Sequence, residues 1–321
     1  MMYFVPSWYH GNEYKENEQY WYRRRTVTEF DDSVKQVQMF NRNNIMNYKI
    51  LNLSYCPNFR HFLHRQSVFH APYWSCFDAI QEIKRTKVDI LSYRDLMWPD
   101  HTEFVYTPFC IVGYVHNEKY AEIHFGEDGN MIEVFLFQSE IMVRKNIYDD
   151  RGFLSTTIVY ENNQPVYEQY LDEKGNWKLL HFFEDDHIEI NSENPYYLIG
   201  NKRFAFDSLN YDSMESLIEE VFSTYLDEMT DSTDIFCLAM HTLHHDLLES
   251  LFTQRKTILS FYQNRMELFE DAELKSLIRS TNYCIVDSKH KIRPLEKYAG
   301  KTLPIVDITP FDTRADFGIS Q

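Results

Sequence analysis

The spacing of hydrophobic residues changes twice along this chain. Over about the first 115 residues, short apolar runs alternate with segments whose apolar residues recur every three or four positions. This alternation is typical of βαβ units around a parallel sheet. It predicts a helix after Asp31 or Asp32, another that begins near Pro57 and a third that includes Phe77, Ile80 and Ile83. The predicted strands are 2–5, 49–53, 68–69, 88–90 and 110–112.

Between about residues 117 and 191 the period becomes two, which indicates antiparallel strands. Gly129, Gly152 and Gly175 recur here at a constant interval of 23 residues, as their numbers show. Each follows a carboxylate by two positions: Glu127, Asp150 and Glu173. Because glycine adopts the positive φ that tight hairpins need, we predict glycine turns in a β-meander of about seven strands. The other turns are expected near 139, 162–165 and 185–186.

The helical period returns after about residue 203. The clearest helix is expected from Asp212 to Met229, where one apolar stripe follows a capping box formed by Asp212 and Glu215. Further strands are expected at 235–239, 257–261, 283–286 and 303–306, separated by helices near 246–252, 271–280 and 290–298. The fold class is therefore α/β, with a meander inserted into one Rossmann-like domain. We divide the chain into 1–116, the insertion 117–191 and 192–321.

Composition narrows the possible functions. The 49 acidic residues exceed the 32 basic ones, and the net charge of −17 disfavours nucleic acid as a partner. The 5 cysteines fit neither a disulfide framework nor a zinc ribbon, and no apolar run is long enough for a membrane span, so we expect a cytoplasmic protein. The 9 glycines form neither a Gly-x-Gly-x-x-Gly nor a Gly-x-x-x-x-Gly-Lys motif. Dinucleotide and P-loop chemistry are disfavoured, and no cofactor is expected.

Candidate ligand-binding residues follow three of the predicted parallel strands. Trp8 and Tyr9 follow the first strand, His241 and His244 follow strand 235–239, and Arg314 follows the last. Loops at the carboxyl edge of a parallel sheet converge, so these residues are candidates to line a cleft. The alternative is a packed loop with a solvated arginine. For the histidines, helix-capping or cleft-lining roles are favoured over a metal, because no zinc motif is present.

Aromatic residues in the meander provide a second set of candidates. An antiparallel insertion has edge strands with unpaired backbone groups, and it packs only one face on the rest of the domain. Its aromatic residues are more numerous than one packed face requires. Most are expected in the core, and the candidates for partner binding are Tyr148, Tyr160, Tyr167 and Tyr170.

Several short motifs occur in a shared order along the chain. They are Tyr-Phe-Val-Pro-Ser-Trp-Tyr at 3–9, Phe-Asp-Asp at 30–32, Tyr-Asp-Asp-Arg-Gly-Phe at 148–153, Pro-Val-Tyr at 165–167, Tyr-Leu-Asp at 170–172 and Leu-Pro-Ile-Val-Asp-Ile-Thr-Pro-Phe-Asp-Thr-Arg at 303–314. Taken together, they resemble the family of the first of the three Asp-named proteins of the accessory Sec system.

This resemblance implies the first half of a GT-B-like fold without glycosyltransferase activity or catalytic residues, in which the meander is an insertion. It also implies a second Rossmann-like half, which would hold most of a sugar-nucleotide donor and which these 321 residues do not contain.

The implied function is a non-catalytic role in modifying and exporting serine-rich repeat adhesins. The implied partners are two other Asp-named proteins, the accessory SecA motor and the adhesin. The protein would be cytoplasmic, with peripheral membrane contact through the translocase as a further option. The alternative is the acceptor-binding half of a GT-B protein O-glycosyltransferase. The loop 6–10, which contains no glycine, disfavours this alternative.

Overall fold

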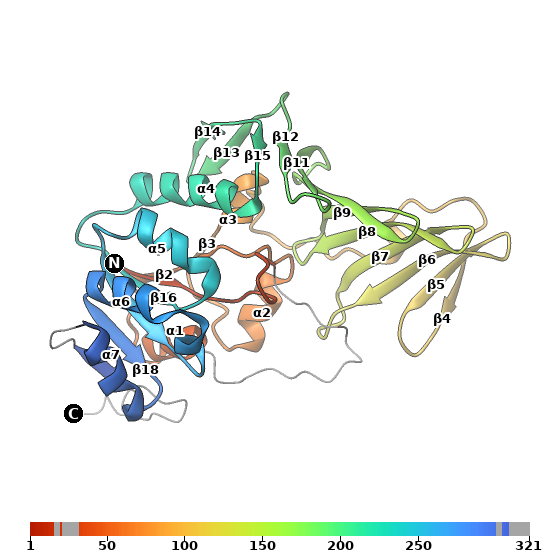
Figure 1. Cartoon of the computed structure of the whole chain (residues 1–321). Helices are drawn as coiled ribbons and strands as arrows, with labels where there is room; N and C mark the ends of the chain where they lie inside the picture. Colours follow the sequence, from red (N-terminus) through yellow and green to blue (C-terminus); the bar gives the residue numbers. More distant parts are fainter. Residues whose placement is uncertain (16–19, 21–31, 300–303, 308–321) are drawn as a thin grey trace.

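Two sheets form the core of the fold. The computed structural model describes residues 1–15, 20, 32–299 and 304–307. Within them, a parallel sheet has the strand order β19 (Ile305–Asp307), β18 (Tyr283–Val286), β17 (Lys256–Phe261), β16 (Ile235–Ala239), β1 (Met2–Val5), β2 (Tyr48–Asn52) and β3 (Tyr73–Ser75). The antiparallel sheet extends sideways from this α/β part (Figure 1). The predicted fold class is confirmed.

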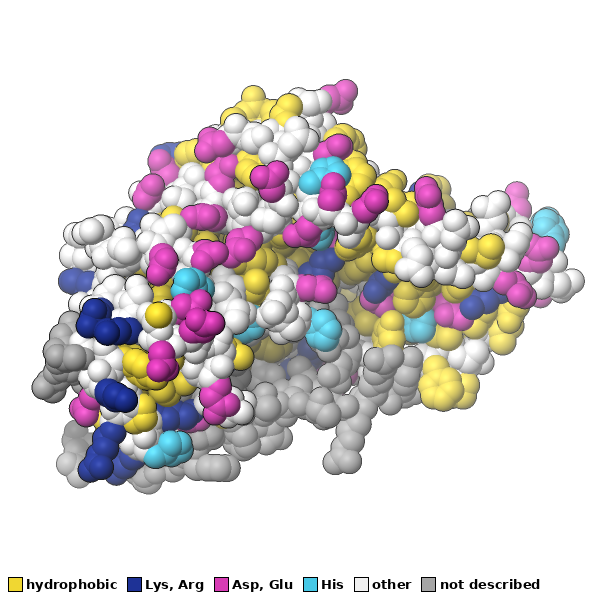
Figure 2. Space-filling model, in the orientation of Figure 1, with side chains coloured by type: hydrophobic (Ala, Val, Ile, Leu, Met, Phe, Trp, Pro, Cys, Tyr) yellow, Lys and Arg dark blue, Asp and Glu magenta, His cyan; other side chains and the backbone are white. Residues whose placement is uncertain are grey.

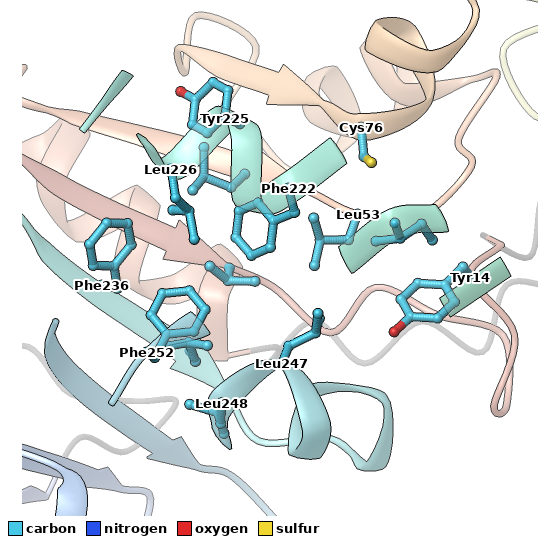
Figure 3. Close-up of a cluster of buried hydrophobic side chains, with 14 of the residues drawn as sticks. Tyr14, Leu53, Cys76, Phe222, Tyr225, Leu226, Phe236, Leu247, Leu248 and Phe252 are labelled. Atoms are coloured by element: carbon cyan, nitrogen blue, oxygen red, sulfur yellow. The ribbon is translucent and has the colours of Figure 1, made fainter. Parts of the chain in front are cut away.

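Helices cover both faces of the parallel sheet, because successive strand side chains point to opposite sides. Phe4 packs into a cluster with α1 (Asp32–Arg42) and α2 (Phe59–Arg65). Its neighbours Tyr3 and Val5 belong to a larger cluster on the other side. The helices of that cluster are α3 (Cys76–Ile80), α4 (Met214–Met229), α5 (His245–Leu251), α6 (Asp271–Ser280) and α7 (Ile292–Ala299). Figure 3 shows how Phe222, Leu226, Phe236 and Phe252 meet in it.

The helix α4 has the predicted apolar stripe but a different cap. Leu217, Val221 and Phe222 on this stripe are fully buried. Ser213, rather than Asp212, is the N-cap residue, and its hydroxyl accepts a hydrogen bond from the backbone N–H of Ser216 at 3.3 Å. A serine cap satisfies an N–H group that the first helical turn leaves without a partner.

The second sheet is an antiparallel meander inserted between β3 and α4. Its strands, in spatial order, are β4 (Glu103–Tyr106), β5 (Ile111–Val115), β6 (Glu118–Phe125), β7 (Met131–Gln138), β8 (Ile141–Asp149), β9 (Phe153–Glu161), β10 (Gln164–Leu171), β11 (Trp177–Phe182), β12 (Ile188–Ile190) and β15 (Asn210–Tyr211). The intervening β13 (Tyr196–Ile199) and β14 (Lys202–Ala205) form a separate hairpin. Seven of these strands, β6 to β12, lie within 117–191, as predicted, and β4, β5 and β15 extend the sheet beyond that range. The partition of the chain into three segments stays a prediction.

The three glycine turns fasten the meander to the α/β part. Gly129, Gly152 and Gly175 all have positive φ, as predicted. The carboxylate of Asp150 accepts a hydrogen bond from the backbone N–H of His61 at 3.0 Å, in the first turn of α2. Glu173 accepts hydrogen bonds from the backbone of Lys84 and Arg85. Glu127 pairs with Arg65. The repeated carboxylates therefore hold the hairpin ends that carry the glycine turns against α2 and the segment after α3.

Three predicted strands of the parallel sheet are wrong. Residues 68–69 form a turn that follows α2, in which the N–H of Val68 donates to the carbonyl of Leu63. Residues 88–90 are irregular, and Ile90 is 94% exposed. The run 110–112 lies largely in β5, which belongs to the meander. Short apolar runs do not distinguish a buried strand from a packed turn, and the third parallel strand is the half-buried β3.

Candidate functional site

The order of the parallel strands reverses between β1 and β16. The chain runs from β1 through β2 to β3 on one side, and from β16 through β17 and β18 to β19 on the other. The segments that follow β1 and β16 lead to α1 and α5, on opposite faces of the sheet. Such a switch point forms a crevice at the carboxyl edge, where open α/β sheets bind their ligands.

Tyr9 and His244 lie at this crevice and contact each other. The Nε2 atom of His244 lies 2.7 Å from the Tyr9 hydroxyl, and its Nδ1 atom lies 2.7 Å from the carbonyl oxygen of Ala239. A carbonyl only accepts, so Nδ1 carries the proton and Nε2 accepts from Tyr9. The side chain is 0% exposed, and burial lowers the pKa of His244 to about 3. Both ring nitrogens of a neutral imidazole are therefore in use.

His241 caps a short helix beside this pair. The backbone N–H of Leu243 donates to Nδ1 of His241 at 3.2 Å, which makes His241 the N-cap of η2 (Thr242–His244). Its ring lies 5.1 Å from that of Tyr9. Burial, and secondarily the charge of Arg265, lowers the pKa of His241 to about 4. The predicted helix-capping role of a histidine is confirmed.

The other two predicted crevice residues do not join this group. Trp8 is buried on the opposite face, where its ring packs on Phe59 and Phe62 of α2 with centroid distances of 6.0 and 4.8 Å. Arg314 lies outside the described residues. Among the described residues, no group of three or more His, Cys, Asp or Glu side chains could hold a metal ion.

Sequence reasoning missed two ion pairs beside the crevice. Arg265, in η3 (Arg265–Leu268) after β17, donates from Nη1 to both carboxylate oxygens of Asp32 at 2.7 Å. Lys15, in the segment after β1, pairs with Glu168 of β10, whose side chain is fully buried. In each pair, the two residues are more than 150 positions apart in the sequence. The sequence indicated Asp32 only as a possible helix cap, and no local sequence pattern identified Lys15 as a candidate site residue.

Two cavities lie between the α/β part and the meander, on either side of the Lys15–Glu168 pair. One, of about 260 Å³, is lined by residues that include Tyr14, Tyr170 and Leu243. The other, of about 240 Å³, includes Tyr55 and Lys145 in its lining. Lys15 lines both cavities, and Glu168 lines the second.

Two of the four meander tyrosines are inaccessible to a partner. Tyr148 is 5% exposed, and Tyr170 is 0% exposed, packed on Tyr55 and Phe77. The register of β8 shifts between Ile147 and Tyr148, and that of β10 shifts beside Tyr170. In both cases the extra residue lies on the neighbouring strand, Ser155 in β9 and Lys178 in β11, so neither tyrosine changes face. The two rings are buried because they pack into hydrophobic clusters on that face. The assignment of these two tyrosines to a partner surface was wrong.

Tyr160 and Tyr167 are half-buried and keep an accessible part. Tyr160 lines a groove of about 860 Å³ at the hairpin ends farthest from the glycine turns, together with Phe137, Val143 and Arg144. The ring of Tyr167 lies 5.7 Å from that of Phe182 in the neighbouring strand. Figure 2 shows hydrophobic side chains gathered along the antiparallel sheet. This part of the meander is therefore a hollow surface that combines apolar side chains with the charged groups of Glu118, Lys119, Arg144 and Glu161.

Comparisons with known proteins agree on one family. The model of the accessory Sec system protein Asp-1 family matches residues 1–321. A protein of that name from Streptococcus gordonii is 32% identical over 327 aligned residues, and one from Staphylococcus aureus is 29% identical. Each alignment spans the whole chain, but only 60% and 61% of the respective relative.

Solved structures extend this likeness. The chain superposes on a structure described as the glycosylation associate protein (Gap123) complex of Streptococcus agalactiae, with a TM-score of 0.87 and 30% identity over 98% of this chain and 61% of that one. It superposes with a TM-score of 0.86 and 29% identity on a structure of accessory secretory proteins 1, 2 and 3 of Streptococcus pneumoniae, over 98% of this chain and 63% of that one. The pneumococcal O-GlcNAc transferase GtfA shares the fold, with a TM-score of 0.65 at 11% identity over 96% of this chain and 60% of GtfA.

No helix among the described residues is both long and apolar enough to cross a membrane.

Proposed function

The chain belongs to the accessory Sec system protein Asp-1 family, and from this premise we propose that it is a non-catalytic component of that system. In this proposal it assists the modification and export of serine-rich repeat glycoprotein adhesins through contacts with other proteins. The proposed partners are two further Asp-named proteins, the accessory SecA motor and the adhesin. The proposed location is the cytoplasm, with peripheral membrane contact through the translocase.

The two histidines at the crevice support a non-catalytic role. A general acid or base needs a titratable group within reach of substrate and a pKa near the operating pH. The buried imidazole of His244 instead hydrogen-bonds Tyr9 and Ala239, and its pKa is lowered to about 3. His241 is similarly shifted, to about 4, and its Nδ1 caps η2. Both groups stay neutral at physiological pH and serve the local fold.

Instead of catalysing a reaction, such a fold is able to provide a surface for contacts with other proteins. The related structure from Streptococcus pneumoniae holds accessory secretory proteins 1, 2 and 3 together, which supports two Asp-named partners for this chain. The meander offers the groove beside Tyr160 as a contact surface. Half-buried aromatic residues suit such a surface, because they bury a large area at a small cost in side-chain entropy.

Co-purification of the chain with the two other Asp-named proteins and with the adhesin tests this function. We expect the wild-type chain to retain all three. Replacement of Tyr160 and Tyr167 together by Ser should weaken at least one of these interactions and leave the fold intact. Tyr283→Ser is the matched control, because Tyr283 is an exposed aromatic on β18 of the other sheet.

A second control examines the crevice. His241→Asn keeps a side chain that is able to cap η2, so the local structure should persist. If His241→Asn abolishes the interactions and the double tyrosine variant retains them, the crevice is the working surface and the assignment to the meander is wrong.

A further inference from the structure

The strand β4 forms a free edge of the antiparallel sheet. Within the part of the chain that the structure describes, β4 pairs only with β5. At the other end of this sheet, β15 is held to α4 by a hydrogen bond from the Tyr211 hydroxyl to Glu220. An uncovered edge exposes backbone N–H and C=O groups that are able to pair with another strand.

The hairpin geometry identifies the outward backbone groups of β4. The N–H of Thr107 donates to the carbonyl of Cys110 at 3.0 Å, so these residues form a hydrogen-bonded pair. Bonded and non-bonded pairs alternate along an antiparallel ladder. Val105 therefore directs its N–H and C=O groups toward β5, whereas Phe104 and Tyr106 direct theirs away from the sheet.

The side chains of this edge do not block strand addition. Natural edges are commonly protected by lysine, proline or a bulge. The sequence of β4 is Glu-Phe-Val-Tyr, its pairing with β5 has no bulge within Glu103–Tyr106, and Val105 and Tyr106 are 49% and 62% exposed. On the face that Tyr106 also occupies, the ring of Phe104 packs on Tyr93 and Trp98. The strand is thus largely apolar and exposed, and the packing of Phe104 fixes its position.

The exposed ring of Tyr106 is held in place before any partner binds. Its hydroxyl hydrogen-bonds the Tyr93 hydroxyl and accepts from Nη2 of Arg94 at 3.1 Å. A side chain fixed in advance loses less conformational entropy when a partner covers it. Tyr106 therefore has the properties of an interface anchor.

We propose that β4 receives an extended, neutral or basic segment of another protein as an added strand. This inference rests on the proposed function, and the partner is one of the two other Asp-named proteins. Charge selects against a second copy of this chain, because the net charge is −17 and the edge strand itself carries Glu103. Main-chain hydrogen bonds to Phe104 and Tyr106 would supply affinity, and contacts with Val105 and Tyr106 would supply selectivity.

Hydrogen exchange and a charged variant test the edge. In the complex of the wild-type chain with the two partners, the amides of Phe104 and Tyr106 should exchange at least about tenfold more slowly than in the free chain, as paired strands do. Val105→Lys places a charge where an edge resists pairing, and it should weaken the complex by about tenfold. Tyr283→Lys, at a position with the same 49% exposure on β18, should bind as the wild type does.

The outcomes separate this inference from the proposed function. A complex that forms with unprotected β4 amides overturns the inference and leaves the proposed function standing. Failure of the wild-type chain to bind either partner overturns both. If the wild-type chain forms a homodimer and the Val105→Lys variant does not, the occupant of the edge is a second copy of this chain, and the proposed partner is wrong. The exchange measurement uses wild-type protein, so it decides the question even if Val105→Lys does not fold.

Discussion

Gly152 occupies a turn whose backbone admits no side chain. Its φ is +91°, and an added Cβ atom would lie 1.8 Å from the carbonyl oxygen of Asp89. Gly129 occupies the preceding turn of the repeat at φ +78°, with no atom within 4 Å of the corresponding position. The two glycines therefore share the conformational requirement and differ in the space around them.

We expect Gly152→Ala to destabilise the protein more than Gly129→Ala. Positive φ costs a residue with a Cβ atom about 1–2 kcal/mol, and this term applies to both variants. Only Gly152→Ala also forces the backbone at Asp89 to move. Thermal and denaturant unfolding of both variants measure the difference, and equal losses would show that the contact with Asp89 does not constrain the turn.

The stability of the protein should depend on pH through His244. Its pKa is about 3 in the folded protein and near 6.5 in the unfolded chain. Below pH 6.5 the unfolded chain binds a proton that the folded protein does not bind. The contribution of His244 to stability is therefore complete above pH 6.5 and is lost as the pH falls toward 3, by at most about 1.4 kcal/mol per pH unit.

His244→Gln isolates this effect. A glutamine is able to donate to Ala239 and accept from Tyr9, but it does not titrate. Asp149 and Asp150 have pKa values raised to about 6 by burial, and they act in the opposite direction in both proteins. Between pH 6.5 and 4, the free energy of unfolding should fall more steeply in the wild type than in His244→Gln. Parallel curves would contradict the assigned neutral imidazole.

Charged side chains that are largely buried connect the helices α2 and α3 to the meander. Arg151, in the turn after β8, donates to both carboxylate oxygens of Asp78 in α3 at 2.7 and 2.8 Å, and to both of Asp149 at 2.7 Å. Asp149 is buried, and Asp150 beside it accepts from the N-terminal turn of α2. This cluster connects two elements of the α/β part to a single hairpin.

Arg151→Met should cost about 3–5 kcal/mol, because it leaves the carboxylate of Asp149 buried without its partner. Lys202→Met is the control. It breaks the surface pair with Glu228, in which the lysine side chain is 71% exposed, and should cost about 1 kcal/mol or less. Chemical denaturation at pH 7 measures both. A loss of similar size in the two variants would show that the buried cluster contributes little to holding the meander.

The whole chain combines a GT-B-like fold with two crevice histidines whose pKa values are lowered by burial. GtfA shares that fold at 11% identity, a level that carries no implication for activity. This chain has no glycine between β1 and Tyr9 that would let its backbone approach a pyrophosphate closely. Tyr9 and His244 hydrogen-bond each other at the carboxyl edge of the sheet.

We therefore expect no transfer of N-acetylglucosamine or glucose from a nucleotide sugar to a serine-rich peptide. Incorporation of labelled sugar measures this, with GtfA as the positive control for N-acetylglucosamine. Incorporation that rises in proportion to the concentration of this chain would contradict the prediction and favour the acceptor-binding half of a protein O-glycosyltransferase.

The local spacing of hydrophobic residues was sufficient to predict much of the fold. Periods of 3.6 and 2 predicted α4, the parallel strands β16 and β18 and the change to a meander, because each depends on which side chains a single element buries. The interval between Gly129, Gly152 and Gly175 predicted three turns at positive φ. The loops after β1 and β16 were predicted to converge, because parallel strands end at one edge, and Tyr9, His241 and His244 do meet there.

Tertiary structure decided what those residues do. Whether His244 faces solvent or hydrogen-bonds Tyr9 and Ala239 depends on atoms far apart in the sequence, as does the pairing of Arg265 with Asp32. Tyr148 and Tyr170 are buried because other residues pack over the face of the sheet that they occupy, which the alternation within one strand does not predict. The spacing of the repeated carboxylates was visible in the sequence, but only their contacts with α2 and with the segment after α3 explain it. A sequence pattern reports the environment of one element, whereas burial, pKa and accessibility arise from contacts between elements.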